Sequence, residues 1–170
     1  ARGFLARYAN YNSFTLARYG QMIKAFMHWY GEPLDDLHFK IPKDLPTYTE
    51  DADIQKLLAV IGEKKSHKKT IERDRLLVET AWKTGLRRAE LAKLKPEDIH
   101  QEALIVRQGK GKKDRMIPLN PDIANKLQAF IKDHKPGQSI FGVGAPWISM
   151  KIKYYAKKAG LPNMHTHALR

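Results

Sequence analysis

Thr84-Gly85-Leu86-Arg87-Arg88-Ala89-Glu90-Leu91 is the stretch that best defines the architecture of this chain. Apolar residues upstream recur every three or four positions, which predicts a helix over about 70–83. Gly85 should end that helix, because glycine tolerates the left-handed backbone of a C-terminal cap, and a short helix from about 88 to 94 should follow. Arg87 then lies in the turn before a helix start, where unpaired backbone N–H groups favour anions.

Downstream of this stretch, 104–106 and 116–119 have the β-branched, apolar composition of strands. Between them lies Gly109-Lys110-Gly111-Lys112-Lys113-Asp114-Arg115, which predicts a hairpin with a basic tip. Asn120-Pro121 opens a further predicted helix, because asparagine caps a helix and proline suits its first position. Another helix is expected around 148–159. The predicted fold class is therefore α+β, mainly helical with a small antiparallel sheet.

The N-terminal part is predicted to be a separate helical unit. A helical apolar stripe covers 14–30, with Asn12 and Ser13 as candidate caps and Gly31 as its end. Prolines then punctuate a polar stretch, and 41–47 is interpreted as a linker between a unit at 1–40 and a larger unit at 48–170. Thr49 is the expected N-cap of the first helix of the larger unit.

The charge balance points to a polyanionic partner. Lys and Arg number 31 against 18 Asp and Glu, a formal net charge of +13, and nucleic acid is the leading candidate. An anionic membrane surface is the alternative, but the basic residues are spread along the chain rather than gathered on one amphipathic helix. The chain has no cysteine, which excludes disulfides, cysteine catalysis and thiolate zinc sites. We expect a soluble, cytoplasmic protein without a membrane span.

Arg87 is the first candidate site residue. Its guanidinium stays charged and offers a fork that matches two phosphate oxygens. Glu90 could hold this arginine through a charge-assisted hydrogen bond, although a solvated helix carboxylate is the simpler interpretation. An ordinary surface arginine is the alternative for Arg87 taken alone, and Arg88 fits that surface role better, as a DNA contact.

Lys110 is the second candidate. A lysine in a glycine-flanked hairpin tip reaches a groove easily and could protonate a departing oxygen. The alternative is simple contact with backbone phosphate, which is the role expected for Lys112, Lys113 and Arg115. ATP binding is not expected, because no Gly-Lys-Ser/Thr of a P-loop is present.

His167 and Arg170 complete the set. On a helix, residues three apart share one face, so an imidazole and a guanidinium would be presented together. His165 and His167 also form half of a possible metal site, but no third ligand is evident and no metal is predicted. The order of arginine, lysine and His-x-x-Arg is far more specific than any one residue.

In these motifs the chain resembles the tyrosine recombinases of the phage integrase family. Thr84–Leu91 is similar to the family's first arginine box, 109–119 to its lysine-bearing hairpin, and His167-Ala168-Leu169-Arg170 to the start of its second box. The resemblance is close over 48–170. It is looser over 1–40, which looks like the C-terminal part of the helical core-binding domain.

This resemblance implies an enzyme that breaks and rejoins double-stranded DNA through a 3′-phosphotyrosine link, without a metal or nucleotide cofactor. Arg87 and Arg170 would clamp the scissile phosphate, Lys110 would be the general acid, His167 would assist proton transfer and Glu90 would support Arg87. A homo-oligomer, a tetramer on DNA, is implied for the full-length protein.

The family's nucleophilic tyrosine follows the second arginine, whereas this sequence ends at Arg170. We therefore assign no nucleophile, and we expect the chain as given to bind DNA without cleaving it. Tyr154 and Tyr155 precede the histidine box, and core or phosphate contact is their expected role.

Two other functions stay open at this point. A non-catalytic, sequence-specific DNA-binding module would use the same basic residues for backbone contact alone. A metal-dependent nuclease or transposase would need a carboxylate cluster, whereas the acidic residues fall mostly in turns and in the first turns of predicted helices.

Overall fold

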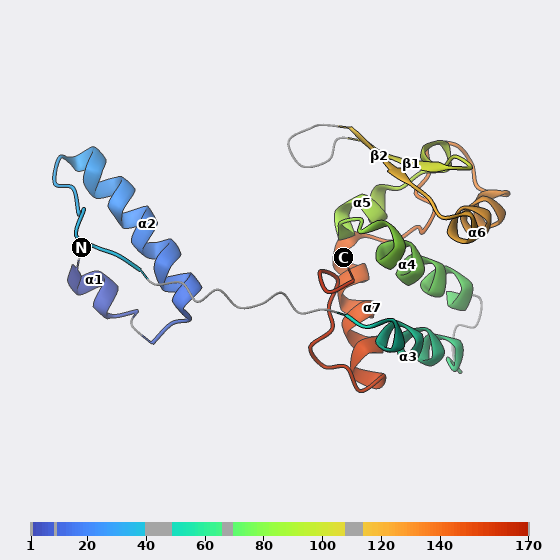
Figure 1. Cartoon of the computed structure of the whole chain (residues 1–170), viewed down its shortest axis with the longest axis horizontal. Coiled ribbons are helices and arrows are strands. Elements are labelled where there is room, and N and C mark those ends of the chain that lie inside the picture. Colours follow the sequence, from blue (N-terminus) through green and yellow to red (C-terminus); the bar gives the residue numbers. More distant parts are fainter. Residues whose placement is uncertain (1, 9, 40–48, 66–69, 108–113, 170) are drawn as a thin grey trace. The chain divides into compact units, whose positions relative to one another are not determined.

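The structure, a computed structural model, describes residues 2–8, 10–39, 49–65, 70–107 and 114–169. The chain divides into two compact units, Ala1–Pro46 and Thr47–Arg170. Helices dominate the second unit, where the described strands form one antiparallel pair (Figure 1). The predicted α+β class, mainly helical with a small antiparallel sheet, is confirmed.

The first unit is built on two helices, α1 (Arg2–Ala6) and α2 (Ser13–Tyr30). The Asn12 side chain accepts a hydrogen bond from the Phe14 N–H, and Gly31 ends α2 with a left-handed backbone (φ 91°), as the sequence predicts. The chain then folds back along α2, where the Phe39 ring lies so close to Gly20 that a methyl group there would overlap it. Gly20 is thus needed for the close approach of this segment.

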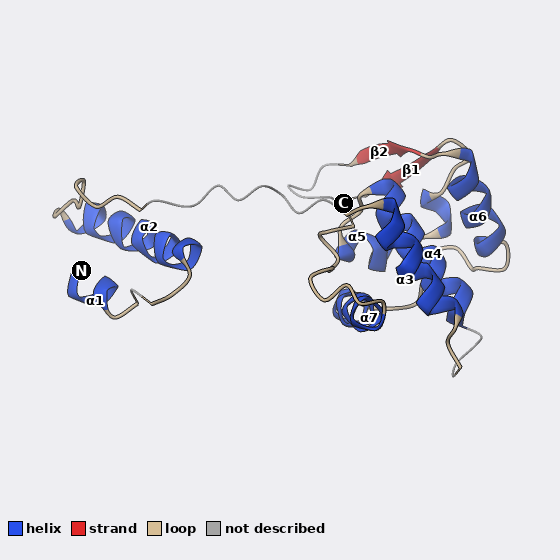
Figure 2. Ribbon diagram, turned by 60° about the horizontal axis from the view of Figure 1, so that its bottom comes forward, coloured by secondary structure: helices blue, strands red, loops and turns tan. Residues whose placement is uncertain are grey.

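Five helices form the body of the second unit: α3 (Asp51–Gly62), α4 (Ile71–Thr84), α5 (Arg88–Lys93), α6 (Pro121–Ile131) and α7 (Ala145–Lys158). Helix α3 packs against α4 and α7, α4 also contacts α5 and α6, and α5 packs on α7. Figure 2 shows these helices gathered beside the short strand pair. One apolar core is formed by buried side chains of the helices, of β1 and of the connections, and the residues that α4 contributes to it include Val78 and Ala81. Its largest fully buried side chains are Ile54, Leu57, Ile61, Leu86, Leu91, Leu104, Ile123, Leu127, Ile140, Phe141, Ile148 and Ile152.

The junction between α4 and α5 has the geometry predicted from its sequence. Gly85 adopts φ 61° and donates its N–H to the Ala81 carbonyl, which ends α4. Leu86 is fully buried and anchors the turn in the core. Arg87 is extended (φ −72°, ψ 151°) and serves as the N-cap of α5. The backbone therefore delivers the Arg87 side chain at a helix N-terminus.

The predicted capping role of Thr49 is wrong. Glu50 is the N-cap residue of α3 and makes no side-chain cap hydrogen bond. The Thr49 hydroxyl instead donates to the backbone carbonyl of Ala168, a residue 119 positions away. The Thr49 hydroxyl thus donates to a distant carbonyl, whereas an N-cap hydroxyl would accept from N–H groups in the first turn of its helix.

The strand pair is a hairpin that follows the 3₁₀ turn η2 (Pro96–Asp98). Strands β1 (Ala103–Val106) and β2 (Arg115–Pro118) pair antiparallel, with Leu104 opposite Ile117 and Val106 opposite Arg115. Leu104 and Val106 are buried, whereas Met116 is 69% exposed, so one face of the hairpin covers the core and the other faces solvent.

A buried polar cluster around Asp74 joins α4, α7 and the segment that follows α3. Its carboxylate is 2% exposed and accepts hydrogen bonds from the Tyr155 hydroxyl (2.6 Å), Lys64 Nζ (3.0 Å) and Arg73 Nη2 (2.8 Å). Burial opposes ionisation, but the hydrogen bonds from Tyr155, Arg73 and Lys64 outweigh it and hold the pKa of Asp74 below its usual value. Tyr155 is thus a core residue, whereas Tyr154 is 48% exposed.

None of the helices in the described ranges combines the length and apolar character that a bilayer crossing requires.

The Tyr155 hydroxyl should contribute measurably to stability. Tyr155→Phe removes one charge-assisted donor from a buried carboxylate, and we expect the free energy of unfolding to fall by about 1.5–3 kcal/mol. Urea unfolding followed by circular dichroism measures the loss. The matched control is Tyr154→Phe, which changes an exposed neighbour and should stay within about 0.5 kcal/mol of the original chain. Equal effects of the two substitutions would contradict the role of the Asp74 cluster.

Candidate functional site

The Arg87 side chain is held by Glu90 from the first turn of α5. Glu90 Oε2 accepts from the Arg87 backbone N–H at 2.7 Å, and Glu90 Oε1 accepts from Arg87 Nη1 at 2.9 Å. The first contact satisfies one of the N–H groups that a helix start leaves unpaired. The ion pair between Arg87 and Glu90 that the sequence suggested is therefore present. The Arg87 side chain remains 37% exposed, so an external anion can reach it.

Arg115, the first residue of β2, binds the same carboxylate. Its Nη1 donates to Glu90 Oε1 at 2.9 Å and its Nη2 donates to Glu90 Oε2 at 2.8 Å, a two-pronged pair. From the sequence, Arg115 is predicted to contact DNA phosphate, and that role stays a prediction. In the structure its guanidinium binds Glu90, while 36% of the side chain faces solvent.

These contacts fix the charge state of Glu90. Hydrogen bonds from Arg115 are the largest influence; burial opposes them, contacts with Arg87 add to them, and together they lower the pKa of Glu90 to about 2. The same hydrogen bonds raise the pKa of Arg115. The cluster of Arg87, Glu90 and Arg115 therefore holds two guanidinium groups and one carboxylate, a net charge of about +1 at neutral pH.

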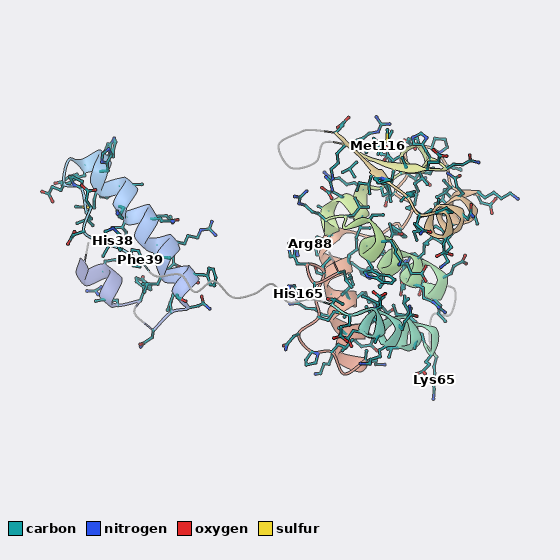
Figure 3. The ribbon with its side chains drawn as sticks, viewed as in Figure 1. His38, Phe39, Lys65, Arg88, Met116 and His165 are labelled. Carbon is teal, nitrogen blue, oxygen red and sulfur yellow. The ribbon has the colours of Figure 1, made fainter. Side chains whose placement is uncertain are left out.

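Arg88 connects α5 to the C-terminal segment. Its Nη1 donates to Ser149 Oγ on α7 at 3.0 Å, and Ser149 Oγ lies 3.4 Å from the hydroxyl of Thr166. Figure 3 shows Arg88 and His165 on one side of the second unit. The structure thus brings the residues next to Arg87 and the residues next to His167 to the same region, although about 80 positions separate them in the sequence.

His167 does not lie on a helix, so the helix predicted at this position is wrong for the described residues, which end at Leu169. Residues 166–169 form turns, with the Ala168 N–H donating to the His165 carbonyl at 2.9 Å. The hydrogen bond from Thr49 occupies the Ala168 carbonyl, which in a helix would accept from the backbone. His167 is exposed, while Leu169 is buried and anchors the turn.

Four of the predicted site residues lie outside the described residues: Lys110, Lys112, Lys113 and Arg170. Their roles stay predictions. The rings of His165 and His167 are 6.2 Å apart between centroids. Across the described ranges, no group of three or more His, Cys, Asp or Glu side chains is arranged to hold a metal ion.

A basic helix face was missed in the sequence. Helix α7 carries Lys151, Lys153, Lys157 and Lys158 and no acidic residue. Lys151 Nζ lies over the rings of both Trp147 and Tyr154, and a hydrogen bond from Lys158 lowers the pKa of Tyr154. The absence of acidic residues between 145 and 158 is visible in the sequence and could have revealed this face.

Basic residues also border an open hollow between α5 and β1. Lys93, Lys95 and Arg107 line it together with Arg87. Its acidic residues are already neutralised, because Asp98 accepts from Arg107 Nε at 2.6 Å and Glu90 binds two arginines. Positive charge therefore predominates where the hollow meets the turn that carries Arg87, and this suits a polyanionic ligand.

Comparison with known proteins gives a family match over residues 47–170, to the family described as the phage integrase family. Among curated proteins, the tyrosine recombinase XerA of Pyrococcus horikoshii is 33% identical over 143 residues, which cover 77% of this chain and 47% of that protein. XerA of Pyrococcus furiosus is 37% identical over 145 residues, covering 77% of this chain and 48% of that protein. The chain thus spans about half the length of these curated relatives.

Solved structures share the fold at lower identity. A XerH site-specific recombinase bound to its difH substrate, in a pre-cleavage complex, matches with a TM-score of 0.72 and 21% identity over 99% of this chain and 55% of that one. A lambda integrase (residues 75–356) dimer bound to a COC′ core site matches with a TM-score of 0.75 and 18% identity, over 99% of this chain and 66% of that one.

Ionisation of Glu90 should make stability depend on pH. An unfolded chain takes up a proton near the ordinary pKa of 4.5, whereas folded Glu90 does so only near pH 2. The unfolded state therefore binds more protons in this window, and the free energy of unfolding should fall as the pH is lowered through it. Glu90→Gln should flatten that decrease, as measured by urea unfolding at a series of pH values.

The matched control is Glu63→Gln, which changes an exposed carboxylate at the end of α3. This variant should keep the full pH dependence, and Asp74 should supply a remaining part of it in every variant. An unchanged slope in Glu90→Gln would contradict the coupling of Glu90 to folding.

Proposed function

Since the chain belongs to the phage integrase family, we propose that its protein is a site-specific recombinase that breaks and rejoins DNA strands through a covalent 3′-phosphotyrosine intermediate. The single observation that carries this proposal is the Arg87 guanidinium, held at a helix N-terminus by an ionised carboxylate and still open to solvent. A fixed guanidinium is a strong partner for a phosphodiester, because its fork matches two phosphate oxygens.

In this proposal, catalysis rests on stabilising the charge that develops on the phosphate. Arg87 and Arg170 bind the non-bridging oxygens of the scissile phosphate. Lys110 protonates the 5′-oxygen as its bond to phosphorus breaks, which releases a 5′-hydroxyl, and His167 assists proton transfer. A tyrosine, which we do not assign, attacks the phosphorus, and the covalent link conserves the bond energy for rejoining. The reaction so written needs no metal or nucleotide cofactor.

The exposed position of His167 supports its proposed role in proton transfer. The turn at 166–169 reaches the neighbourhood of α5 through the contacts of Ser149 with Arg88 and Thr166. A hydroxyl from the start of the unit, that of Thr49, also holds this turn. A fixed turn keeps an imidazole at a constant position relative to Arg87, which proton transfer requires.

Double-stranded DNA is the proposed partner. The net charge of +13, the lysines of α7 and the basic border of the hollow support contact with a phosphate backbone. Arg88, Lys112 and Lys113 are proposed to join these contacts. We further propose a homo-oligomer, a tetramer on DNA, and a cytoplasmic location on the nucleoid.

The proposed domain roles follow the two units. Residues 1–40 belong to a helical core-binding domain, 41–47 are the linker, and 48–170 form the catalytic domain. The compact units at Ala1–Pro46 and Thr47–Arg170 are compatible with this division.

Substitution of Arg87 tests the enzymatic function. In the full-length product of the gene, Arg87→Ala should lower the rate of DNA strand cleavage by about a hundredfold or more, because a transition-state contact is lost. Duplex affinity should change little. Arg75→Ala is the control, since it removes an exposed arginine of α4 that has no proposed role in the site, and it should keep cleavage within about tenfold.

The outcome separates the enzyme from a non-catalytic DNA-binding module. A module would show no cleavage before substitution, and Arg87→Ala would only reduce the salt dependence of binding by about one phosphate contact. That result would overturn the proposed activity. Cleavage that is lost on chelation of divalent cations would instead favour a metal-dependent nuclease.

Removal of 1–40 tests the proposed core-binding role. We expect the shortened chain to bind duplex DNA at least about tenfold more weakly, because phosphate contacts are lost. The larger unit has its own core and should keep its helical circular dichroism and cooperative unfolding. Filter binding at fixed salt measures the affinity, and an unchanged affinity would count against the proposed domain role.

A further inference from the structure

Arg115 occupies a position between two parts of the second unit. It begins β2, and its guanidinium binds Glu90 in the first turn of α5, 25 residues earlier in the sequence. Both Nη atoms are used, at 2.9 and 2.8 Å from the two carboxylate oxygens. The pair therefore joins the base of the hairpin to the helix start that carries Arg87.

Each oxygen of Glu90 serves both arginines. Oε1 accepts from Arg87 Nη1 and Arg115 Nη1, while Oε2 accepts from the Arg87 backbone N–H and Arg115 Nη2. Rotation of the carboxylate would break contacts to Arg115, so the carboxylate plane is fixed. Without Arg115, the same carboxylate would be free to turn onto the Arg87 guanidinium and form a two-pronged pair with it.

The charge balance gives a second consequence. With Arg115 present, the cluster of Arg87, Glu90 and Arg115 has a net charge of +1. Without it, Arg87 and Glu90 form a neutral pair, and the attraction of Arg87 for a phosphate is weakened because an unshielded carboxylate lies 2.9 Å from its Nη1. Arg115 thus allows Glu90 to hold Arg87 in place without cancelling the positive charge of Arg87.

We propose that Arg115 is a positioning residue, which acts through Glu90 to keep the Arg87 guanidinium both fixed and electrostatically available to the scissile phosphate. This inference rests on the proposed recombinase function. It gives Arg115 a role different from direct contact with backbone phosphate.

The test is a charge-balance rescue in the full-length product of the gene. Arg115→Met leaves Arg87 beside an uncompensated carboxylate, and we expect single-turnover cleavage to fall by about a hundredfold. Adding Glu90→Gln removes that carboxylate charge, and glutamine can still accept the Arg87 backbone N–H at the third helix position. The double variant should recover at least about tenfold of the lost rate.

If the Arg115–Glu90 pair only links the hairpin to the helix, the double variant should show no recovery of the cleavage rate. The double variant has lost the ion pair on both sides, so its rate would be no higher than that of Arg115→Met, and this result would overturn the proposal. A direct phosphate contact predicts that Arg115→Met lowers the salt slope of duplex binding by about one and that no rescue occurs, which would overturn it too.

Additional variants keep the test decisive. Arg115→Lys retains the positive charge but loses the fork, and its rate should stay within about tenfold of the original; a rate as low as that of Arg115→Met would overturn the charge argument. If Arg115→Met loses cooperative unfolding, Arg115→Gln replaces it as the neutral variant. Absence of cleavage in the unsubstituted protein would refute the proposed function itself, so the two failures are distinguishable.

Discussion

The negative charge of a nearly buried carboxylate must be compensated by positive partners, and the candidate site is built around this constraint at Glu90. The side chain is only 9% exposed, and it remains ionised because two guanidinium groups and a backbone N–H donate to it. This shared acceptor determines where α5 begins relative to the hairpin, because Arg87 and Arg115 must both reach it. The geometry of the turn after Gly85 therefore depends on an interaction with β2.

The same principle operates at the other end of α4. Asp74 collects donors from α4 itself, from the segment after α3 and from α7. Asp74 thus ties α4 to α7 and to the segment after α3, whereas Glu90 ties the start of α5 to β2. The Thr49 hydroxyl adds a third long-range tie, which holds the turn that carries His167. Together these contacts produce a rigid frame around a solvent-facing arginine, and rigidity of this kind reduces the reorganisation needed when a phosphate binds.

Acidic and basic residues are used differently in this frame. The buried carboxylates of Asp74 and Asp98 bind arginines or lysines inside the second unit. Lysines of α7 instead lie on a helix without acidic neighbours. These lysines are therefore not cancelled by acidic residues of their own helix, which suits contact with a nucleic-acid backbone. The family match and the shared fold place this charge on an architecture found in recombinases bound to DNA.

The sequence alone determined the features that depend on neighbouring residues: the helix ends at Gly31 and Gly85, the caps at Asn12 and Asn120, the two strands, and the pairing of Arg87 with Glu90. Caps, turns and apolar periodicity act over a few residues, so they can be predicted from local patterns. Only the tertiary structure decided that Arg115 binds Glu90, that Thr49 binds Ala168 and that Asp74 binds Tyr155. These partners are 25 to 119 residues apart, and the pairing of a polar side chain at such a distance is set by how the helices pack, which no local pattern records.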